Sequence, residues 1–68
     1  MTINQLKYLI SISKFRSFSK ASDELKVTQP ALTLQIKKLE DEVGFKLFDR
    51  TQKPLKLTRE GDFILKKA

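Results

Sequence analysis

The amino-acid sequence predicts a mainly α-helical domain, with a core of three helices followed by a two-stranded β-hairpin. The helices are indicated by apolar residues that recur at steps of three and four over residues 3–14, 18–25 and 29–43. The hairpin is indicated by two short segments on either side of a Gln-Lys-Pro turn: Leu47 and Phe48 lead into Arg50, and Leu55 and Leu57 alternate with Lys56. A chain of 68 residues is long enough for one small domain only.

Charge and composition limit the classes of function. The net charge of +6 favours an anionic partner, most often a nucleic acid and less often a membrane surface. The chain has no cysteine and no histidine, which excludes disulfides, thiolate chemistry and imidazole-based zinc sites. Its N-terminus lacks the long apolar run of a signal peptide or membrane span, so we expect a cytoplasmic protein with no membrane partner.

The first helix is expected over residues 3–14. Thr2 is placed to cap it, and Gln5, three residues later, can complete a capping box. We expect one apolar face to pack into the core, with Tyr8 and Ile12 at its edges. This face consists of Ile3, Leu6, Leu9, Ile10 and Ser13.

The second helix is expected over residues 18–25, with Ser17 as its N-cap. Its inward side would carry Phe18, Ala21, Ser22 and Leu25, of which the two small residues would allow the next helix to cross closely. A connection of three residues, 26–28, then leads into the third helix. A short helix, a three-residue turn and a capped second helix form a helix-turn-helix pattern.

The third helix is expected over residues 29–43. Thr28 is a strong N-cap candidate, Pro30 fits the first turn because its missing N–H costs nothing there, and Gly44 can end the helix with a positive φ. One side of the helix carries an apolar stripe that should face the core. The stripe consists of Leu32, Ile36, Leu39 and Val43.

The opposite side of the third helix has no acidic residue in its N-terminal half. It carries Gln29, Pro30, Thr33, Leu34 and Lys37. The three acids, Glu40, Asp41 and Glu42, lie in the last turn, where we expect them to be solvated. Such a helix can direct its N-terminal end at a phosphate-lined groove, which predicts a recognition helix.

Residues KLFDR and LKLT are expected to form two short strands joined by a basic turn around residues 52–54. This hairpin, about residues 46–57, would be the wing of a winged helix-turn-helix fold. Thr58 would then cap a last helix from about residue 59. In that helix we expect Phe63 to face inward. Ile64, Leu65 and Ala68 would remain for a partner.

Four motifs follow one another along the chain: QLKYL, SFSKAS, VTQPALTLQIKKLEDEVG, and LFDR followed by LTREG. In this order and spacing the chain resembles the N-terminal DNA-binding domain of LysR-type bacterial transcriptional regulators. The resemblance covers essentially all 68 residues. It implies a winged helix-turn-helix DNA-binding domain over residues 1–58 and the start of a linker helix, used for dimerisation, over residues 59–68.

The resemblance also implies partners. Double-stranded DNA would be bound at dyad-symmetric sites, by a homodimer of the full-length protein, at the bacterial nucleoid. A small-molecule effector would bind only through a C-terminal effector-binding domain, which is absent from these 68 residues. We expect no cofactor, no metal and no catalytic residue in the sequence at hand.

Carried over position by position, the resemblance implies a set of DNA-contacting residues. Gln29, Pro30 and Thr33 would reach bases and phosphates, and Lys53 at the wing tip would approach the minor groove. Gln29 has the amide needed for a bidentate pair with adenine. Phosphate attraction or backbone proximity would come from the remaining candidates, which are Ser17, Ser19, Lys20, Lys37, Arg50 and Thr51.

The sequence departs from the family pattern at four positions. Leu34 stands where many members have arginine, so a basic contact is missing and contact with a thymine methyl becomes available. Thr33 replaces the more usual serine and keeps the hydroxyl. Arg16 stands where glycine is common, which casts doubt on a left-handed turn there, and Ser22 replaces a frequent alanine.

Several alternatives stay open at this point. Gln29 and Thr33 can belong to a solvated helix face, Lys37 can form a salt bridge with Asp41, and Arg50 can serve as a structural ion pair or cap in the wing. An enzyme is disfavoured, because no nucleophile is accompanied by a base that would activate it. A winged-helix module that binds protein remains the alternative function, although it would not need a recognition face free of acids.

Overall fold

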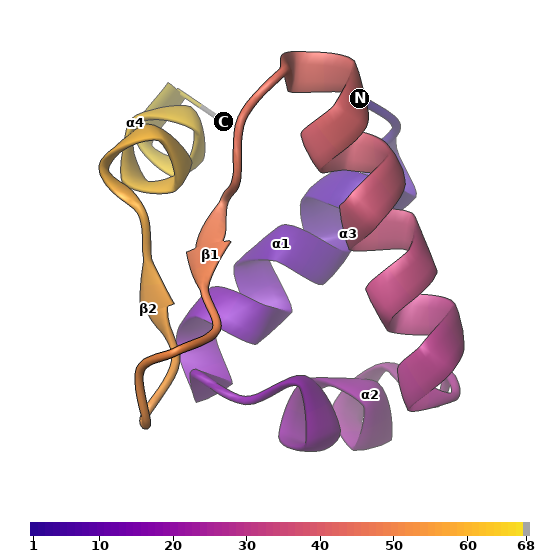
Figure 1. Cartoon of the computed structure of the whole chain (residues 1–68). Coiled ribbons are helices and arrows are strands. Elements are labelled where there is room, and N and C mark those ends of the chain that lie inside the picture. The colour runs from indigo at the N-terminus through magenta and orange to yellow at the C-terminus, as the bar shows by residue number, and fades with distance from the viewer. Residues whose placement is uncertain (68) are drawn as a thin grey trace.

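The computed structural model describes residues 1–67. In chain order, the elements are α1 (Ile3–Phe15), α2 (Phe18–Leu25), α3 (Gln29–Val43), β1 (Phe48–Asp49), β2 (Lys56–Leu57) and α4 (Arg59–Lys67). Figure 1 shows α1, α2 and α3 around a common centre, with the β1–β2 hairpin beside α1 and α4 beyond the hairpin. The predicted mainly helical fold with a two-stranded wing is confirmed.

The helix ends follow the expected capping signals. The Thr2 hydroxyl accepts the Gln5 N–H at 3.0 Å, and the Gln5 side chain accepts the Thr2 N–H at 3.0 Å, which completes the capping box. The Thr28 hydroxyl accepts the Ala31 N–H at 3.2 Å at the start of α3. Gly44 ends α3 with φ 88°, a conformation that side chains disfavour. Local sequence therefore fixes where α3 begins and ends.

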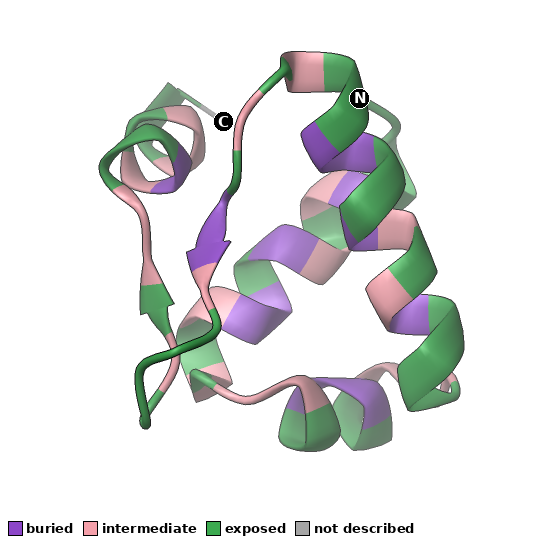
Figure 2. Cartoon of the chain, viewed as in Figure 1, coloured by how far each residue is buried: buried purple, intermediate pink, exposed green. Residues whose placement is uncertain are grey.

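The core lies between the three N-terminal helices and the first strand, as the buried inner faces in Figure 2 show. Its members are Leu9, Ile12, Ala21, Leu32, Ile36, Leu39, Leu47 and Phe48. The predicted stripe of α3 is confirmed, since three of its members are fully buried and Val43 packs partly buried against them. This stripe holds α3 with its other side outward.

The predicted inward face of α1 is wrong in part. Ile3 is 74% exposed and Ile10 is 46% exposed, whereas Gln5, Leu9 and Ile12 are buried. The sequence has apolar residues on more than one side of this helix, and α2 and α3 cover only the side of Leu9 and Ile12. Spacing alone could not choose between the overlapping stripes.

Arg16 forms the left-handed turn that its side chain made doubtful. Its φ is 51° and its ψ is 38°, and its N–H donates to the Ile12 carbonyl at 2.7 Å to cap α1. Its own carbonyl accepts the Leu55 N–H at 3.3 Å. The turn between α1 and α2 therefore also anchors the C-terminal arm of the wing.

The wing is an antiparallel hairpin in which Phe48 pairs with Leu57 and Asp49 pairs with Lys56. Each strand has two residues, which is shorter than predicted. Strand pairing stops after Asp49 because the chain turns there, and the wing turn follows. At the end of the hairpin nearest α4, the Thr58 N–H donates to the Leu47 carbonyl at 2.9 Å. This one hydrogen bond joins the two arms beyond the paired strands.

Helix α4 begins as predicted, because the Thr58 hydroxyl accepts the Gly61 N–H at 2.9 Å. The inward placement of Phe63 is wrong: Phe63 is 61% exposed, while Ile64 and Leu65 pack partly buried against the core. Gly61 explains the rotation of the helix. It is buried against the Leu47 carbonyl, where a Cβ would not fit, and Ile64 and Leu65 follow it at steps of three and four. Ala68 lies outside the described residues.

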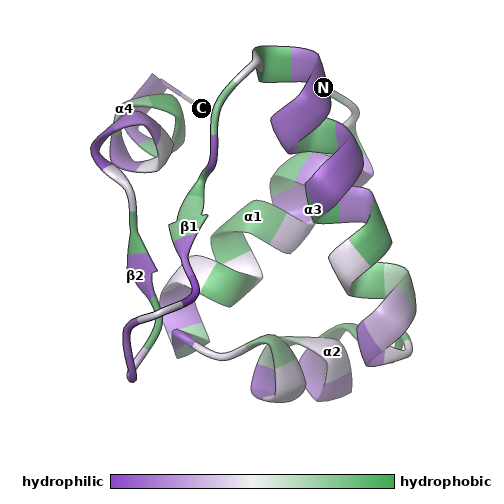
Figure 3. Ribbon diagram, in the orientation of Figure 1, coloured by the Kyte–Doolittle hydropathy of each residue, from purple (hydrophilic) through white to green (hydrophobic). Residues whose placement is uncertain are grey.

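Hydropathy follows this arrangement. Figure 3 shows apolar segments toward the centre of the three-helix core and polar segments on the outer side of α3 and along the wing turn. Within residues 1–67, no helix combines the length and the hydropathy needed to cross a membrane.

Candidate nucleic-acid interface

The start of α3 and the wing turn lie on the same side of the domain, the lower side in Figure 1. Between them is a hollow of about 420 Å³ that brings together residues from distant parts of the sequence. Its lining includes five of the predicted DNA-contacting residues, which are Ser17, Gln29, Thr33, Arg50 and Lys53. The fold therefore places the predicted helix and wing contacts next to one another.

The outer face of α3 forms a second, adjoining surface. Gln29, Pro30, Thr33, Leu34 and Lys37 line it together. All are exposed except Thr33, which is half-buried, and Leu34 is an apolar residue with 52% of its surface exposed. Among residues 1–67 no ion pair joins Lys37 to Asp41, so the ammonium group of Lys37 is not held by the salt bridge that was the alternative.

The N-terminal end of α2 adds polar groups at the same side. Ser19 and Lys20 are exposed. The Ser17 hydroxyl accepts the Lys20 N–H at 3.2 Å and so serves as the helix cap. The exposed Lys20 side chain adds positive charge to this side of the domain. Ser17 caps the first turn of α2, in which Lys20 lies.

Arg50 has a structural contact, but a different one from the ion pair or cap considered above. Its guanidinium carbon lies 4.5 Å from the centre of the Phe18 ring, in cation–π geometry. Phe18 in turn meets Phe48 edge to face, with ring centres 5.8 Å apart. Stacking engages the flat face of the guanidinium and leaves its N–H groups free to donate at the rim, which is suited to a phosphate.

Thr51 acts inside the wing turn. Its hydroxyl donates to the Asp49 carboxylate at 2.5 Å, and its N–H donates to the same oxygen at 3.0 Å. These hydrogen bonds from Thr51 hold the pKa of Asp49 below its usual value. Since the Thr51 hydroxyl proton is taken by Asp49, the residue shapes the turn that carries Lys53.

The expectation that all the acids of α3 are solvated is wrong for Glu40. This residue is 5% exposed, and its carboxylate accepts the Leu47 N–H at 2.7 Å. The signal in the sequence is weak but present, because Glu40 follows Ile36 by four residues and so borders the buried stripe. Sequence reasoning also missed Arg16 and Phe18 as residues that line the hollow together with Lys53.

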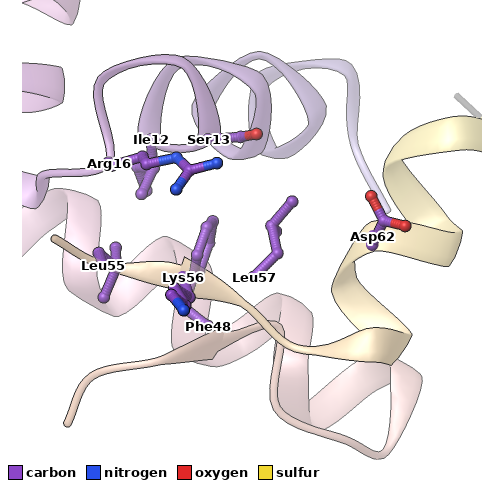
Figure 4. Close-up of a pocket in the computed structure, with 8 residues that line it drawn as sticks. All are labelled: Ile12, Ser13, Arg16, Phe48, Leu55, Lys56, Leu57 and Asp62. Carbon is purple, nitrogen blue, oxygen red and sulfur yellow. The ribbon is translucent and has the colours of Figure 1, made fainter. Parts of the chain in front are cut away.

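Another hollow, of about 360 Å³, lies between the end of α1, the wing and α4. Figure 4 shows apolar Leu55 and Leu57 in it, with Arg16 at the α1 edge and Asp62 at the α4 edge. None of the predicted DNA-contacting residues lines this hollow. Within the described part of the chain, no group of three or more histidine, cysteine or acidic residues could hold a metal ion.

Known proteins share both the sequence and this geometry. The family described as "Bacterial regulatory helix-turn-helix protein, lysR family" matches residues 3–62. The regulator CfxR of Cupriavidus necator is 41% identical over the whole chain, which spans 22% of that protein. BenM of Acinetobacter baylyi and the dual regulator OxyR of Escherichia coli are each 40% identical, again over the whole chain and 22% of their own length.

Solved structures agree with the sequence comparison. A complex of the BenM DNA-binding domain with benA site 1 DNA superposes with a TM-score of 0.94 at 39% identity, over 98% of this chain and 75% of that one. A complex of the CbnR DNA-binding domain with DNA gives 0.91 at 33% identity, over 98% and 77%. The chain therefore belongs to the LysR family of bacterial regulatory helix-turn-helix proteins, whose named relatives are transcriptional regulators.

Proposed function

We propose that the chain binds double-stranded DNA in a sequence-specific manner, as the DNA-binding part of a bacterial transcriptional regulator. The observation that carries the proposal is the shared surface of α3 and the wing, where polar and basic side chains converge and the N-terminal half of α3 has no acidic residue. The BenM and CbnR domains, which superpose closely on this chain, were solved as complexes with DNA. That likeness supports the same use of the surface here.

In this proposal the N-terminal half of α3 enters the major groove. Gln29 forms a bidentate pair with adenine, and Thr33 donates to a base or a phosphate. Leu34, which is exposed on the same face, contacts a thymine methyl. Pro30 and Lys37 flank these residues, and Lys37 attracts a phosphate.

The wing and the start of α2 position the domain on the duplex. Lys53 approaches the minor groove or the adjacent backbone, and Arg50 and Lys20 attract phosphates. Ser19 lies next to Lys20 at the exposed start of α2. Thr51 contributes by holding the wing turn through Asp49. Contacts of this kind fix orientation, while the α3 side chains supply sequence preference.

We further propose that the domain acts within a longer protein. The chain spans 22% of the length of CfxR, BenM and OxyR, which leaves room for an effector-binding domain. Residues 59–68 would start a linker helix through which two subunits pair at a dyad-symmetric site. The domain would bind DNA without catalysing a reaction. It would act in the cytoplasm at the nucleoid, where the bacterial DNA lies.

The test is selection of binding sequences from random duplex DNA, followed by fluorescence anisotropy on the selected duplex and a scrambled one. We expect the selected duplex to bind at least about a thousandfold more tightly, the lower end for specific recognition when both half-sites are engaged. Equal affinities would contradict sequence-specific binding. A chain that also fails to adsorb to DNA-cellulose at low salt would favour the alternative, a winged-helix module that binds protein.

A further inference from the structure

The buried carboxylate of Glu40 has no role in the DNA contacts proposed above. It lies on α3, 5% exposed, with one oxygen accepting the Leu47 N–H at 2.7 Å and the other 4.0 Å from the Lys46 ammonium. Burying a carboxylate is unfavourable, and an apolar residue at such a site is often equally stable. Stability of the core therefore does not by itself account for an acid at this position.

The hydrogen bond from Leu47 joins the recognition helix to the base of the wing. Leu47 is fully buried and directly precedes β1, and its carbonyl accepts the Thr58 N–H at 2.9 Å. The Thr58 hydroxyl donates to the Lys46 carbonyl at 2.6 Å. Through Glu40, both arms of the hairpin are thus tied to α3.

Glu40 also lies between the two elements that would contact DNA, α3 and the wing. It lines the hollow between α3 and the wing base, together with Thr33 and Lys37 from the helix and Arg50 from the wing. Farther along the wing, the Leu55 N–H donates to the Arg16 carbonyl and Arg50 stacks on Phe18, so these contacts reach the end of α1 and the start of α2 and do not reach α3. Glu40 is therefore the side-chain connection between the helix that would read bases and the hairpin that would follow the backbone.

We propose that Glu40 is a positioning residue, which sets the wing against the recognition helix so that Lys53 and Gln29 meet one duplex in a fixed relative placement. The inference rests on the proposed DNA contacts of these two residues. A wing fixed before binding loses little conformational freedom on the duplex, whereas a loosened wing must be ordered during binding. Removing the tie should therefore weaken the contribution of Lys53 and leave that of Gln29 unchanged.

The experiment measures those contributions in two backgrounds. Lys53→Ala and Gln29→Ala are each introduced into the wild-type chain and into Glu40→Ala, and affinities for the selected duplex are measured by anisotropy at one salt concentration. The loss from Lys53→Ala should shrink by at least about twofold in the Glu40→Ala background, because coupled sites depart from additivity by about twofold or more. The loss from Gln29→Ala should be the same in both backgrounds.

Asp41→Ala is the matched control, because Asp41 is the next residue of α3, carries the same charge and is exposed. It should leave both losses unchanged, which separates the tie from the general effect of removing a negative charge near DNA. Glu40→Gln serves if Glu40→Ala does not fold. The amide retains an acceptor oxygen but sets an NH₂ group against Lys46, so the loss from Lys53→Ala should shrink partially.

Amide hydrogen exchange supplies a readout that does not involve DNA. The Leu47 amide should exchange faster in Glu40→Ala than in the Asp41→Ala control, relative to core amides of α1 in the same samples. A role limited to global stability would raise exchange across the core and lower the melting temperature, but it would leave the loss from Lys53→Ala intact.

Two outcomes would overturn the proposal and are distinguishable. If Lys53→Ala weakens binding equally in the wild-type, Glu40→Ala and Glu40→Gln backgrounds, the positioning role is wrong while the proposed function stands. If Lys53→Ala has no effect even in the wild-type chain, the wing contact in the proposed function is wrong, and the positioning role is lost with it.

Discussion

The salt dependence of DNA binding is the most direct consequence of the charges on the proposed interface. Four basic side chains lie exposed at this surface, namely Lys20, Lys37, Arg50 and Lys53. Each phosphate neutralised by such a group releases condensed counterions from the duplex. Four contacts therefore predict a slope of log affinity against log salt of about −3.6 per domain. Raising the salt from about 50 to about 200 mM should weaken binding about 150-fold.

Single charge removals make this prediction residue-specific. Lys53→Gln should reduce the slope by about 0.9, because one phosphate contact is lost. Lys66→Gln is the control, since Lys66 lies on α4, on the opposite side of the domain from the wing turn, and pairs with Asp62 at 3.2 Å. It removes the same charge from the chain but should leave the slope unchanged.

Fluorescence anisotropy of a labelled duplex, titrated at five or more salt concentrations, gives both slopes. A slope near zero for the wild-type chain would refute an electrostatic interface. Equal changes for Lys53→Gln and Lys66→Gln would show that net charge matters and that the placement of charge on the wing does not.

Further predictions concern specificity, the wing turn, α4 and assembly. Gln29→Ala should cost about 1–3 kcal/mol on the selected duplex and much less on random DNA, and equal losses in anisotropy titrations would refute base reading. Thr51→Val should raise the pKa of Asp49, measured by carboxyl NMR. Because the folded-state pKa of Asp49 is lowered, the wild-type turn gains stability above the unfolded pKa and loses it as pH falls through the folded one. The variant should show a smaller dependence, because its backbone N–H still donates to Asp49. Gly61→Ala should destabilise the fold by about 1–3 kcal/mol in urea titrations, because its Cβ meets the Leu47 carbonyl. Without DNA the chain should sediment as a monomer or weak dimer at tens of micromolar, because Phe63 offers far less than the roughly 1,200 Å² of a stable interface, and a single dimeric boundary would contradict this.

The features that sequence predicts well here are set by neighbours along the chain. The capping box of Thr2 and Gln5, the Thr28 cap and the Gly44 end each depend on a few adjacent residues. The stripe of α3 was equally clear, because the opposite side has apolar Pro30 and Leu34 among polar and basic residues and offers no second apolar stripe. Most of the helix-turn-helix could therefore be read without knowledge of the rest of the fold.

The errors arose where a contact distant in sequence decides the outcome. Ile3 and Ile10 satisfy helical spacing, but which side of α1 is covered depends on how α2 and α3 pack. The rotation of α4 is set by the close approach of Gly61 to Leu47, which turns Phe63 outward. Glu40 is buried by a backbone N–H that belongs to the wing. Propensity and periodicity contain none of this information.

The candidate interface could be predicted from the sequence in part. The composition of the α3 face followed from the residues themselves, while the roles of Lys53 and Lys20 came from the resemblance to the family and stay predictions. That Arg50 stacks on Phe18 could not be foreseen, because the two residues are 32 positions apart and belong to different elements. Only the folded chain brings the wing against the start of α2.

The arginine in the left-handed turn after α1 has an evolutionary consequence. A left-handed conformation costs a side chain about 1–2 kcal/mol, which a glycine at the same place would avoid. Glycine, however, gives the unfolded chain more freedom, worth about 0.4–1 kcal/mol, and a cation at a helix C-terminus is favourable by about 0.3–1 kcal/mol. These effects nearly cancel, so exchange between Arg16 and glycine is close to neutral for folding. Genetic drift can therefore exchange glycine and arginine at this turn without a compensating change, and arginine places a basic group at the edge of the hollow between α1, the wing and α4.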